Sequence, residues 1–487
     1  MQQDDVEETH GRRLSRRVFL AGLGAGAAAL AVQGPPDAAR AAKGGSPKPT
    51  PTPTTAPTYG HPLPQGYLHT AGAQITASDG TPVRLAGVNW YGFECNSFVA
   101  GGLDHQTLDF ICQKTVSLGF NVIRLPFSVQ LVLQNPVVTS YLNANPSLQG
   151  LPALDIMGRV ISTAGKYGLK VILDCHRSEA GWSWQSNGLW YSQTYTEDLY
   201  RQAWQQVTMR FASDPNATNP TVIGCDLRNE PAAPPKDSAA WPANGGSAWG
   251  FGDDNTTGYP RDWAAAAERT ANQVILALNP NLLIFVEGVR GDPAGPYVNG
   301  QKYLYWPGGS LVGVGKAGGA RPAPRLISLN VPNRLVYSAH DYGPDAYSAL
   351  AWCQLNSTAN TPDACYSVWD QAWGFIAKGW TDANGVFHQH PVLLGEFGTV
   401  NGYKPNDDTP KQYYTDINSS NAQGNWFTYL VQYMKDNGIH WTYWALNGSQ
   451  SLAPGRDPSM PDWYGVLKPD WSDYASAPLM NKLHSIQ

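Results

Sequence analysis

Short apolar runs recur along the chain from residue 88 to residue 447, and most of them end in polar or aromatic residues. There are eight, at residues 88–92, 121–127, 169–176, 221–231, 282–288, 334–342, 391–398 and 439–447. Between them, stretches such as residues 261–279 carry apolar positions at three-to-four spacing, which is typical of amphipathic helices. Eight strands alternating with helices predict an α/β fold whose parallel sheet closes into a (β/α)8 TIM barrel. A doubly wound open sheet is the alternative, but no glycine-rich phosphate loop follows the first run.

The segment before the barrel has the pattern of a short β-hairpin. Asp79 and Gly80 form a turn pair between two stretches of alternating residues within the segment 69–92. Such a pair between alternating runs is a strong hairpin signal. We therefore expect an N-terminal β-hairpin ahead of the first barrel strand.

Residues 1–41 have the features of a twin-arginine signal peptide. Arg16 and Arg17 precede a weakly apolar run rich in glycine and alanine, and residues 39–41 offer a small-x-small cleavage site. The apolar run is too short and too rich in glycine for a membrane span, and a soluble amphipathic helix is the alternative. We expect an exported, extracellular protein without stable membrane insertion, either released or held at the cell envelope.

Residues 42–60 are rich in proline and threonine and lack apolar periodicity, which predicts a stiff, extended linker. The rest of the chain, residues 61–487, contains all eight apolar runs and no second linker. We expect these residues to form one domain, at the upper end of the size range of such barrels.

Composition narrows the class of ligand. The chain has 487 residues, a net charge of -5 and only 15% charged residues, which argues against nucleic acid as a partner. Its 18 Trp and 24 Tyr suit a neutral, hydroxyl-rich ligand, because aromatic faces pack against the apolar faces of sugar rings. The alternative is a core that simply contains many aromatic side chains.

The ends of the apolar runs carry the candidate chemistry. They hold Asn89, Trp90, Arg124, Asp174, His176, Asn229, Glu230, Glu287, His340, Tyr342, Glu396 and Trp444. In a parallel barrel the carboxyl ends of all strands meet on one face, where active sites are built. We expect these side chains to lie close together.

Glu230 and Glu396 form the pair that matters most. Glu230 lies at the end of the fourth run, before Pro231, which is expected to hold its backbone in an extended conformation. Glu396 ends the seventh run between two glycines. Two carboxylates facing each other across a barrel mouth can cleave a glycosidic bond, and a separation of about 5–5.5 Å gives net retention.

The neighbours of the two glutamates predict their roles. Arg124 and Tyr342 can donate to Glu396 and keep it ionised, as a nucleophile requires. Glu230 lacks a facing cation, since strand alternation directs Arg228 to the other face, and this suits a general acid that His340 can tune.

Other chemistries find weaker support. Asp174, His176, His340 and Glu396 are metal-ligand types, but no tight spacing such as His-Glu-x-x-His joins them. No Gly-x-Ser-x-Gly motif is present, so serine hydrolase chemistry is not expected. Glu287 is interpreted as a structural or network-forming carboxylate. We expect neither a metal nor a cofactor.

Eight stretches of the domain carry a resemblance to a known family. They are "GVNWYGFE", "LGFNVIRLPFS", "ILDCHR", "DLRNEP", "NPNLLIFVEGV", "VPNRLVYSAHDY", "VLLGEFGT" and "WTYWALN". By these stretches, in this order, the domain resembles glycoside hydrolase family five, and most of all its bacterial endo-β-1,4-glucanase branch. The resemblance implies that Glu230 is the acid/base and Glu396 the nucleophile. The other residues that it implies around the sugar-binding centre are Arg124, His176, Asn229, His340, Tyr342 and Trp444; we add Trp90 from its place at a strand end.

The resemblance implies a retaining endo-β-1,4-glucanase that acts on a β-linked polysaccharide or oligosaccharide. With the export signal we expect a secreted enzyme, and we expect a monomer. The same mechanism on mannan, mixed-linkage glucan, a glycosylated lipid or a plant glycoside is the alternative, and a barrel that binds sugar without turnover is a third. Cys175 and Leu446 depart from the family pattern. Substrate choice depends on loops 177–192 and 232–260, whose candidate sugar platforms are Trp182, Trp184, Trp190, Trp241 and Trp249.

The six cysteines permit disulfides in an exported protein. Cys353 and Cys365 bracket a short loop and form the best candidate pair, and Cys95 with Cys112 is the second. Cys175 and Cys225 lie within predicted strands, where we expect buried free thiols.

Overall fold

The computed structural model describes most of the chain from residue 60 onward. The described residues are 60–182, 185–232, 246–250, 259–289, 297–298, 301–302, 305–315, 324–346, 361–401 and 422–487. The predicted signal peptide, and the predicted linker up to residue 59, lie outside them. Residues Pro57–Gln487 form one compact unit.

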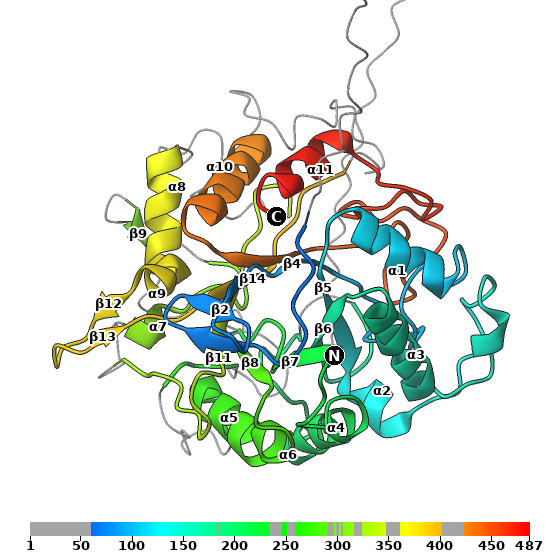
Figure 1. Ribbon diagram of the computed structural model, residues 1–487, viewed down its shortest axis with the longest axis horizontal. Helices are drawn as coiled ribbons and strands as arrows, with labels where there is room; N and C mark the ends of the chain where they lie inside the picture. Colours follow the sequence, from blue (N-terminus) through cyan, green and yellow to red (C-terminus); the bar gives the residue numbers. More distant parts are fainter. Residues whose placement is uncertain are drawn as a thin grey trace, which may run out of the picture. The chain divides into compact units, whose positions relative to one another are not determined.

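A closed barrel of eight parallel strands lies at the centre of this unit (Figure 1). Its strands are β4 (Ala86–Asn89), β5 (Val122–Ser128), β6 (Lys170–Arg177), β7 (Val222–Asp226), β8 (Leu283–Glu287), β11 (Leu335–His340), β14 (Val392–Glu396) and β15 (His440–Tyr443). Each neighbouring pair is parallel, and β15 pairs with β4 to close the ring. Every predicted apolar run overlaps one of these strands, so the TIM-barrel prediction is confirmed.

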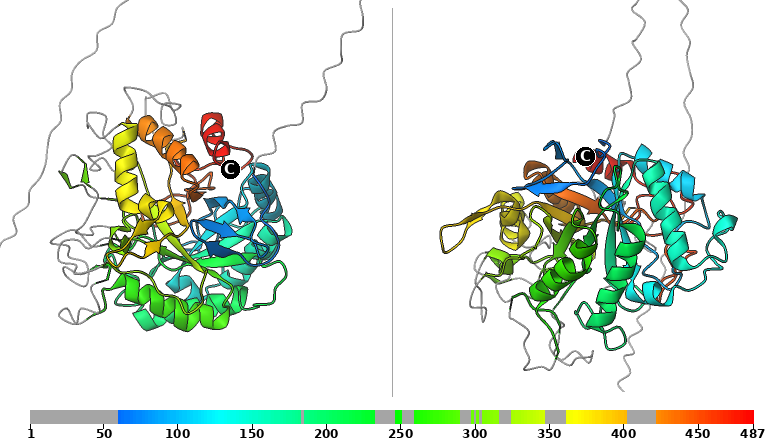
Figure 2. Two further views of the ribbon diagram at one scale, coloured as in Figure 1. Left: turned by 60° about the vertical axis from the view of Figure 1, so that its left-hand side comes forward. Right: turned by 60° about the horizontal axis from the view of Figure 1, so that its bottom comes forward.

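Helices surround the barrel in all three ribbon views (Figures 1 and 2). They are α1 (Leu108–Ser117), α2 (Val129–Gln134), α3 (Ala153–Lys166), α4 (Glu197–Phe211), α5 (Trp263–Thr270), α6 (Leu276–Leu278), α7 (Val312–Gly315), α8 (Pro362–Trp369), α9 (Phe375–Lys378), α10 (Ala422–Asp436) and α11 (Ala477–His484). Their ends follow local chemistry: α4 begins where the Thr196 side chain accepts a hydrogen bond from the Leu199 N–H, with Glu197 and Asp198 in the first turn.

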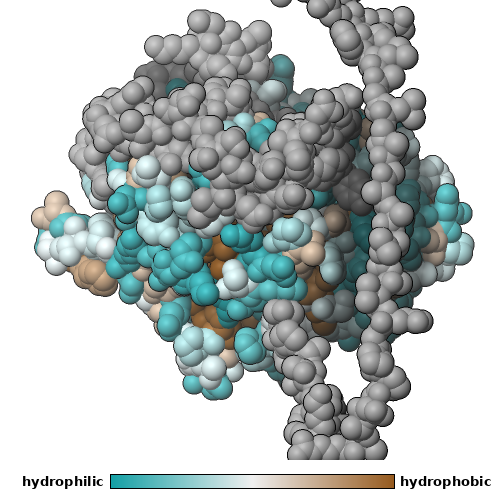
Figure 3. Space-filling view, turned by 90° about the horizontal axis from the view of Figure 1, so that it is seen from above, coloured by the Kyte–Doolittle hydropathy of each residue, from teal (hydrophilic) through white to brown (hydrophobic). Residues whose placement is uncertain are grey.

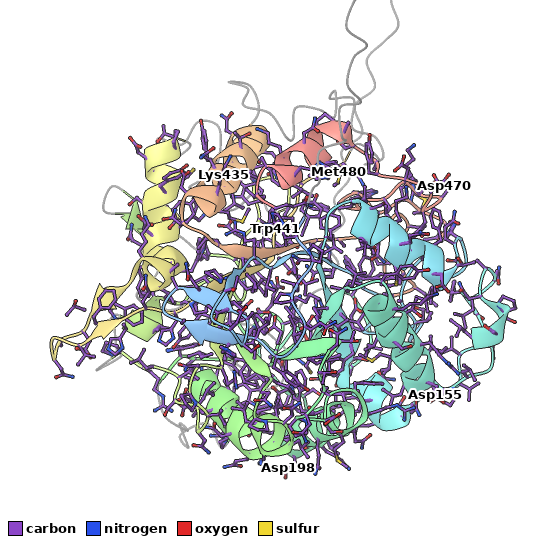
Figure 4. All side chains as sticks on the ribbon, in the orientation of Figure 1. Asp155, Asp198, Lys435, Trp441, Asp470 and Met480 are labelled. Atoms are coloured by element: carbon purple, nitrogen blue, oxygen red, sulfur yellow. The ribbon has the colours of Figure 1, made fainter. Side chains whose placement is uncertain are left out.

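The helices separate a polar exterior from an aromatic interior. Figure 4 shows Trp441 well inside the molecule and Asp155, Asp198 and Lys435 on the outer helices. Trp441 is fully buried on β15, whereas Asp198 and Lys435 are exposed. On the face in Figure 3, the described surface is mostly hydrophilic with small separate hydrophobic areas. No described helix is long and apolar enough to cross a membrane.

The predicted N-terminal hairpin is present, and a third strand joins it. Strands β1 (His69–Ala71), β2 (Gln74–Thr76) and β3 (Pro82–Val83) form an antiparallel sheet in that order. The turn between β2 and β3 contains Asp79 and Gly80, as predicted, and the positive φ of 85° at Gly80 explains the need for glycine there.

This small sheet covers the amino-terminal end of the barrel. Leu68 and Ile75 are buried against apolar residues that the barrel strands contribute near their starts. Those residues are Val122, Ile172, Ile223, Leu283, Phe285, Val336 and Leu393. With this end filled by apolar side chains, the opposite end is left for the polar strand tips.

Cysteine placement corrects one prediction. Cys95 and Cys112 are free, buried thiols, so the second-choice disulfide between them is wrong. Cys112 packs on α1 in the main core, whereas Cys95 belongs to a separate aromatic cluster at the barrel mouth. Cys175 and Cys225 are free and buried, as expected. Cys353 lies outside the described residues, and its predicted pairing stays a prediction.

Candidate active site

A cleft of about 420 Å³ lies at the carboxyl ends of the barrel strands. Its lining residues are Glu94, His176, Gly181, Trp182, Asn229, Glu230, Trp306, Tyr342, Asp345, Ala346, Glu396, Trp444, Arg456, Asp462, Trp463 and Tyr464. This volume is within the range of small-ligand sites in proteins, and the mixture of aromatic and polar groups suits a sugar. Six of the strand-end residues that the sequence singled out line this cleft: His176, Asn229, Glu230, Tyr342, Glu396 and Trp444.

The two glutamates face each other in this cleft. One carboxylate oxygen of Glu230 and one of Glu396 lie within 4.8 Å of each other, and His340 offers a ring nitrogen within the same distance of both. Glu230 is 7% exposed and Glu396 4% exposed, so each is open to the cleft by only one edge. Two nearly buried carboxyl groups at this spacing can act on the same bond.

Glu230 has a backbone conformation that the sequence did not predict. Strand β7 ends at Asp226, and Glu230 lies beyond it with a φ of 50°, in the left-handed region rather than in extended geometry. The conformation is held by the Glu230 N–H, which donates to Glu287 Oε2 at 2.7 Å. A carboxylate from the neighbouring strand thus overrides the local preference imposed by Pro231.

Glu396 is the last residue of β14 and has two donors. Arg124 Nη1 donates to Oε1 at 2.8 Å, and the Tyr342 hydroxyl donates to Oε2 at 3.0 Å, which are the two predicted contacts. Burial nevertheless raises the pKa of Glu396 above its usual value, because the positive charges of His340 and Arg124 offset the desolvation only in part.

Arg124 is fully buried and connects the strand tips. Besides Glu396, its guanidinium contacts Asn89, Asp174, Asp226, Asn229 and Glu287, at 2.8–3.1 Å. Burial alone would lower the pKa of Arg124, but the surrounding carboxylates, Asp174 first, raise it well above its usual value. Arg228 points away from the glutamates toward Cys175 and Gln185, as strand alternation predicts.

His340 is enclosed by carboxylates. Its Nδ1 lies 3.1 Å from Glu230 Oε1, and its Nε2 lies 3.1 Å from Glu287 Oε1. Although burial opposes the charged form, these carboxylates and Glu396 raise the pKa of His340 well above its usual value. Glu287 therefore has the network position that the sequence indicated.

One cluster in the described part of the chain could also hold a metal ion, and it consists of Glu230, His340 and Glu396. A histidine side chain must be neutral to bind a metal ion, however. Burial would lower the pKa of His340, but Glu287, Glu396 and Glu230 raise it well above its usual value, which favours the protonated ring. The cluster therefore fits a pair of carboxylic groups with a cationic neighbour better than it fits a metal centre.

Trp444 forms an aromatic wall with two other rings. It stacks on Tyr91 at a centroid distance of 5.2 Å and on His176 at 5.4 Å. His176 is in turn oriented by Asp174, whose Oδ2 lies 2.6 Å from its Nδ1. Burial lowers the pKa of His176, but Asp174 more than compensates, so its pKa is raised. These contacts hold the ring of Trp444 in place in the cleft that Glu396 also lines.

The other tryptophans that the sequence proposed as substrate contacts fall into three groups. Trp90 is fully buried, donates from its indole to the Gly101 carbonyl at 2.9 Å and is not among the residues that line the described cleft, so its predicted contact with substrate stays a prediction. Trp190 and Trp249 are likewise buried in the main hydrophobic core. Trp182 lines the cleft. The candidate platforms at positions 184 and 241 lie outside the described residues.

Sequence reasoning missed several cleft residues. The Trp306 indole donates to Glu230 Oε1 at 2.6 Å. The Arg456 guanidinium lies 3.7 Å from the ring centre of Trp182 and donates to Asp462 and to the Tyr91 hydroxyl. These residues come from long loops without periodicity, and the only available signal was their aromatic or charged character.

Comparison with known proteins adds independent information. The family model for cellulases of glycosyl hydrolase family 5 matches residues 77–450. An endoglucanase of Paenibacillus polymyxa is 35% identical over 412 residues, 84% of this chain and 84% of that protein. The major extracellular endoglucanase of Xanthomonas campestris pv. campestris is 31% identical over 403 residues, 82% of this chain and 67% of that protein. An endocellulase of Pyrococcus horikoshii, solved with cellotetraose, superposes with a TM-score of 0.65 at 30% identity, covering 87% of this chain and 99% of the other.

Proposed function

The chain belongs to glycosyl hydrolase family 5, and on that premise we propose that it is a retaining endo-β-1,4-glucanase. Family membership makes it a glycoside hydrolase, and its relatives support β-glucan as the substrate class. What we propose beyond family membership is that it cleaves β-1,4 bonds, that it retains the anomeric configuration and that it acts within the chain. The observation that carries it is the distance of at most 4.8 Å between oxygens of Glu230 and Glu396.

That distance supports a double displacement. Retaining pairs lie about 5–5.5 Å apart, whereas inverting pairs need roughly 6.5–9.5 Å to admit a water molecule. Glu396 attacks the anomeric carbon while Glu230 gives its proton to the glycosidic oxygen, so that the C–O bond breaks and a glycosyl ester forms. Glu230, now a carboxylate, then takes a proton from water as the water oxygen displaces Glu396.

The surrounding residues orient these groups. Arg124 and Tyr342 hold the two oxygens of Glu396, so the nucleophile cannot rotate away from the anomeric carbon. Arg124 also donates to the side-chain oxygen of Asn229, so the NH2 group of Asn229 is left to donate to a sugar hydroxyl. Trp444 lines the cleft, where an aromatic ring can pack on a sugar.

The described cleft suits an uncharged glucan. Aromatic rings line it, and its one arginine, Arg456, is paired with Asp462. We also propose export by a twin-arginine signal in residues 1–41, a linker at residues 42–60, and action as a monomer outside the cell or at its envelope. The name of the Xanthomonas relative, an extracellular endoglucanase, supports the location. Mannan, mixed-linkage glucan, a glycosylated lipid or a plant glycoside is the alternative substrate.

The test uses residues 42–487 on carboxymethyl cellulose, mixed-linkage glucan, mannan and aryl glycosides. We expect rapid viscosity loss on the β-1,4-glucans, with a product that first appears as the β-anomer by NMR. Glu396→Gln and Glu230→Gln should each lower turnover of glucan by about a thousandfold or more. Glu197→Gln, on the outer helix α4, is the matched control and should keep full activity.

Two results would change the proposal. Cleavage confined to mannan or to small glycosides would keep the mechanism and reject cellulose as the substrate. Sugar binding without turnover on any substrate would reject the enzyme activity, and an α-anomer as first product would reject retention.

A further inference from the structure

Trp306 contacts the proposed proton donor directly, and the mechanism above does not use it. Its indole Nε1–H donates to Glu230 Oε1 at 2.6 Å. His340 Nδ1 reaches the same oxygen at 3.1 Å. Two groups on two different segments therefore meet at Oε1, and Trp306 also lines the cleft.

The segment that carries Trp306 is tied to the backbone around Glu230. The Gly308 N–H donates to the carbonyl of Pro231 at 3.3 Å, and the Gly308 carbonyl accepts from Gly288 at 2.8 Å. Gly308 has a φ of 72°, and a Cβ atom there would lie 2.2 Å from Glu287 Oε2. Only glycine fits at this point, so the turn that follows Trp306 is held against the acid.

The ring of Trp306 is also held from the side of the nucleophile. It packs on Tyr342 at a centroid distance of 4.7 Å, and the Tyr342 hydroxyl donates to Glu396 at 3.0 Å. Trp306 thus touches the donor through its N–H and the nucleophile's hydrogen-bond partner through its ring. An indole fixed in this way cannot leave Glu230 without breaking two contacts.

We infer that Trp306 is a positioning residue for the proton donor, one that occupies Glu230 Oε1 and leaves Oε2 to carry the catalytic proton. The inference rests on the proposed function. In the first step Oε2–H gives its proton to the glycosidic oxygen, and in the second Oε2 takes a proton from the attacking water. Because an N–H bond to Oε1 favours the ionised carboxylate, Trp306 also promotes release of that proton.

The titratable groups that face Glu230 come from other segments. They are His340 at the end of β11, Tyr342 two residues after it, Glu287 at the end of β8 and Glu396 at the end of β14. A substitution of Trp306 changes none of these four titratable residues. A change in the pH profile of such a variant therefore reports the loss of the indole N–H.

The experiment compares Trp306→Phe with the wild-type chain. Phenylalanine keeps an aromatic ring beside Tyr342 and removes the donor. On cellotetraose we expect kcat/KM to fall by about tenfold, within the range that proton transfer supplies, and the alkaline limb of its pH profile to move to higher pH. On 2,4-dinitrophenyl β-cellobioside, whose leaving group needs no proton, the loss should stay below about threefold.

Trp182→Phe is the matched control, because Trp182 lines the same cleft but packs on Tyr91 and Arg456 instead of Glu230. It should alter KM without moving the alkaline limb. If Trp306→Phe does not fold, benzothienylalanine at position 306 keeps the ring size and replaces only the N–H by sulfur. Its profile should shift in the same direction.

Equal losses on both substrates with an unmoved alkaline limb would overturn the inference and leave Trp306 a packing residue. This failure is distinct from failure of the proposed function. If Glu230→Gln and Glu396→Gln retain wild-type turnover, the function itself is wrong. If both are inactive while Trp306→Phe behaves like Trp182→Phe, only the role of Trp306 is wrong.

Discussion

Arg124 illustrates how single residues organise the cleft. It is fully buried, and carboxylates from β6, β7, β8 and β14 surround its guanidinium. Burying an ion pair costs solvation energy that the mutual attraction only about balances, so such pairs are weak evidence for stability. The effect of these ion pairs is geometric, because the planar guanidinium group of Arg124 sets the positions of Glu396 and Asn229 at the same time.

Asp341 is a buried acid whose charge state should affect stability. It accepts a hydrogen bond from the Tyr305 hydroxyl at 2.6 Å, and burial raises its pKa to about 7 from the ordinary 3.8. Between about pH 4 and pH 7 the unfolded chain releases this proton while the folded chain keeps it. This group therefore makes the free energy of unfolding fall as the pH rises through that window, by on the order of 4 kcal/mol in all.

Asp341→Asn should remove this dependence. The amide keeps an oxygen acceptor for Tyr305 and cannot ionise, so the variant should gain stability relative to the wild type as the pH rises from 4 to 7. Urea unfolding at several pH values measures the difference. Asp436→Asn, on the exposed end of α10, is the control and should run parallel to the wild type. A parallel course for Asp341→Asn would show that this carboxyl is not buried as described.

At the scale of elements, the N-terminal sheet and the barrel share one apolar cluster. Ile75 on β2 is fully buried among side chains of the barrel strands, at the end opposite the cleft. The sheet is small, so its stability must come from this burial, since short isolated strands are marginal in water. The sheet therefore contributes to the fold and not to the chemistry.

Ile75→Ala should separate stability from activity. Deleting a buried isoleucine side chain costs about 2–5 kcal/mol of unfolding free energy. Because the site lies at the other end of the barrel, kcat on soluble glucan should stay within about twofold of wild type. Denaturant unfolding and turnover assays measure the two effects, with Val137→Ala at a 61% exposed position as the control. A large loss of kcat with intact stability would contradict this division.

At the scale of the whole molecule, the cleft residues come from segments far apart in the sequence. Glu94 and Tyr464 are separated by most of the domain, yet both line the cleft, because parallel strands end on one face of the barrel. All described residues of the site lie in the compact unit Pro57–Gln487. The chemistry should therefore need no residue outside that unit.

A chain that begins at Pro57 should have the same kcat/KM and unfolding temperature as residues 42–487. A chain that begins at Arg84 lacks β1 to β3 and should unfold at a clearly lower temperature, since it exposes the apolar end of the barrel. Thermal melts and assays on soluble glucan test both. Activity that drops more than about threefold in the Pro57 chain would assign residues 42–56 a part in turnover.

Several features followed from the sequence alone because they depend on local patterns. Apolar runs with helices between them specified the eight strands, and Asp79 with Gly80 specified the hairpin turn. The polar ends of the runs indicated Glu230 and Glu396 as partners, since parallel topology brings strand ends together whatever the loops do. Periodicity and topology are sufficient for these predictions.

Other features were decided by contacts between distant segments. The positive φ of Glu230 depends on a hydrogen bond from its N–H to Glu287. The buried indole of Trp90 depends on a hydrogen bond to the backbone carbonyl of Gly101, and no spacing in the sequence identifies that partner. Trp306 reaches Glu230 only because a loop folds back on Pro231. Long loops lack periodicity, and their paths are set by close packing and hydrogen bonds that exist only in the folded chain. The sequence by itself thus determined the barrel and its pair of glutamates, while the tertiary structure decided which side chains surround that pair.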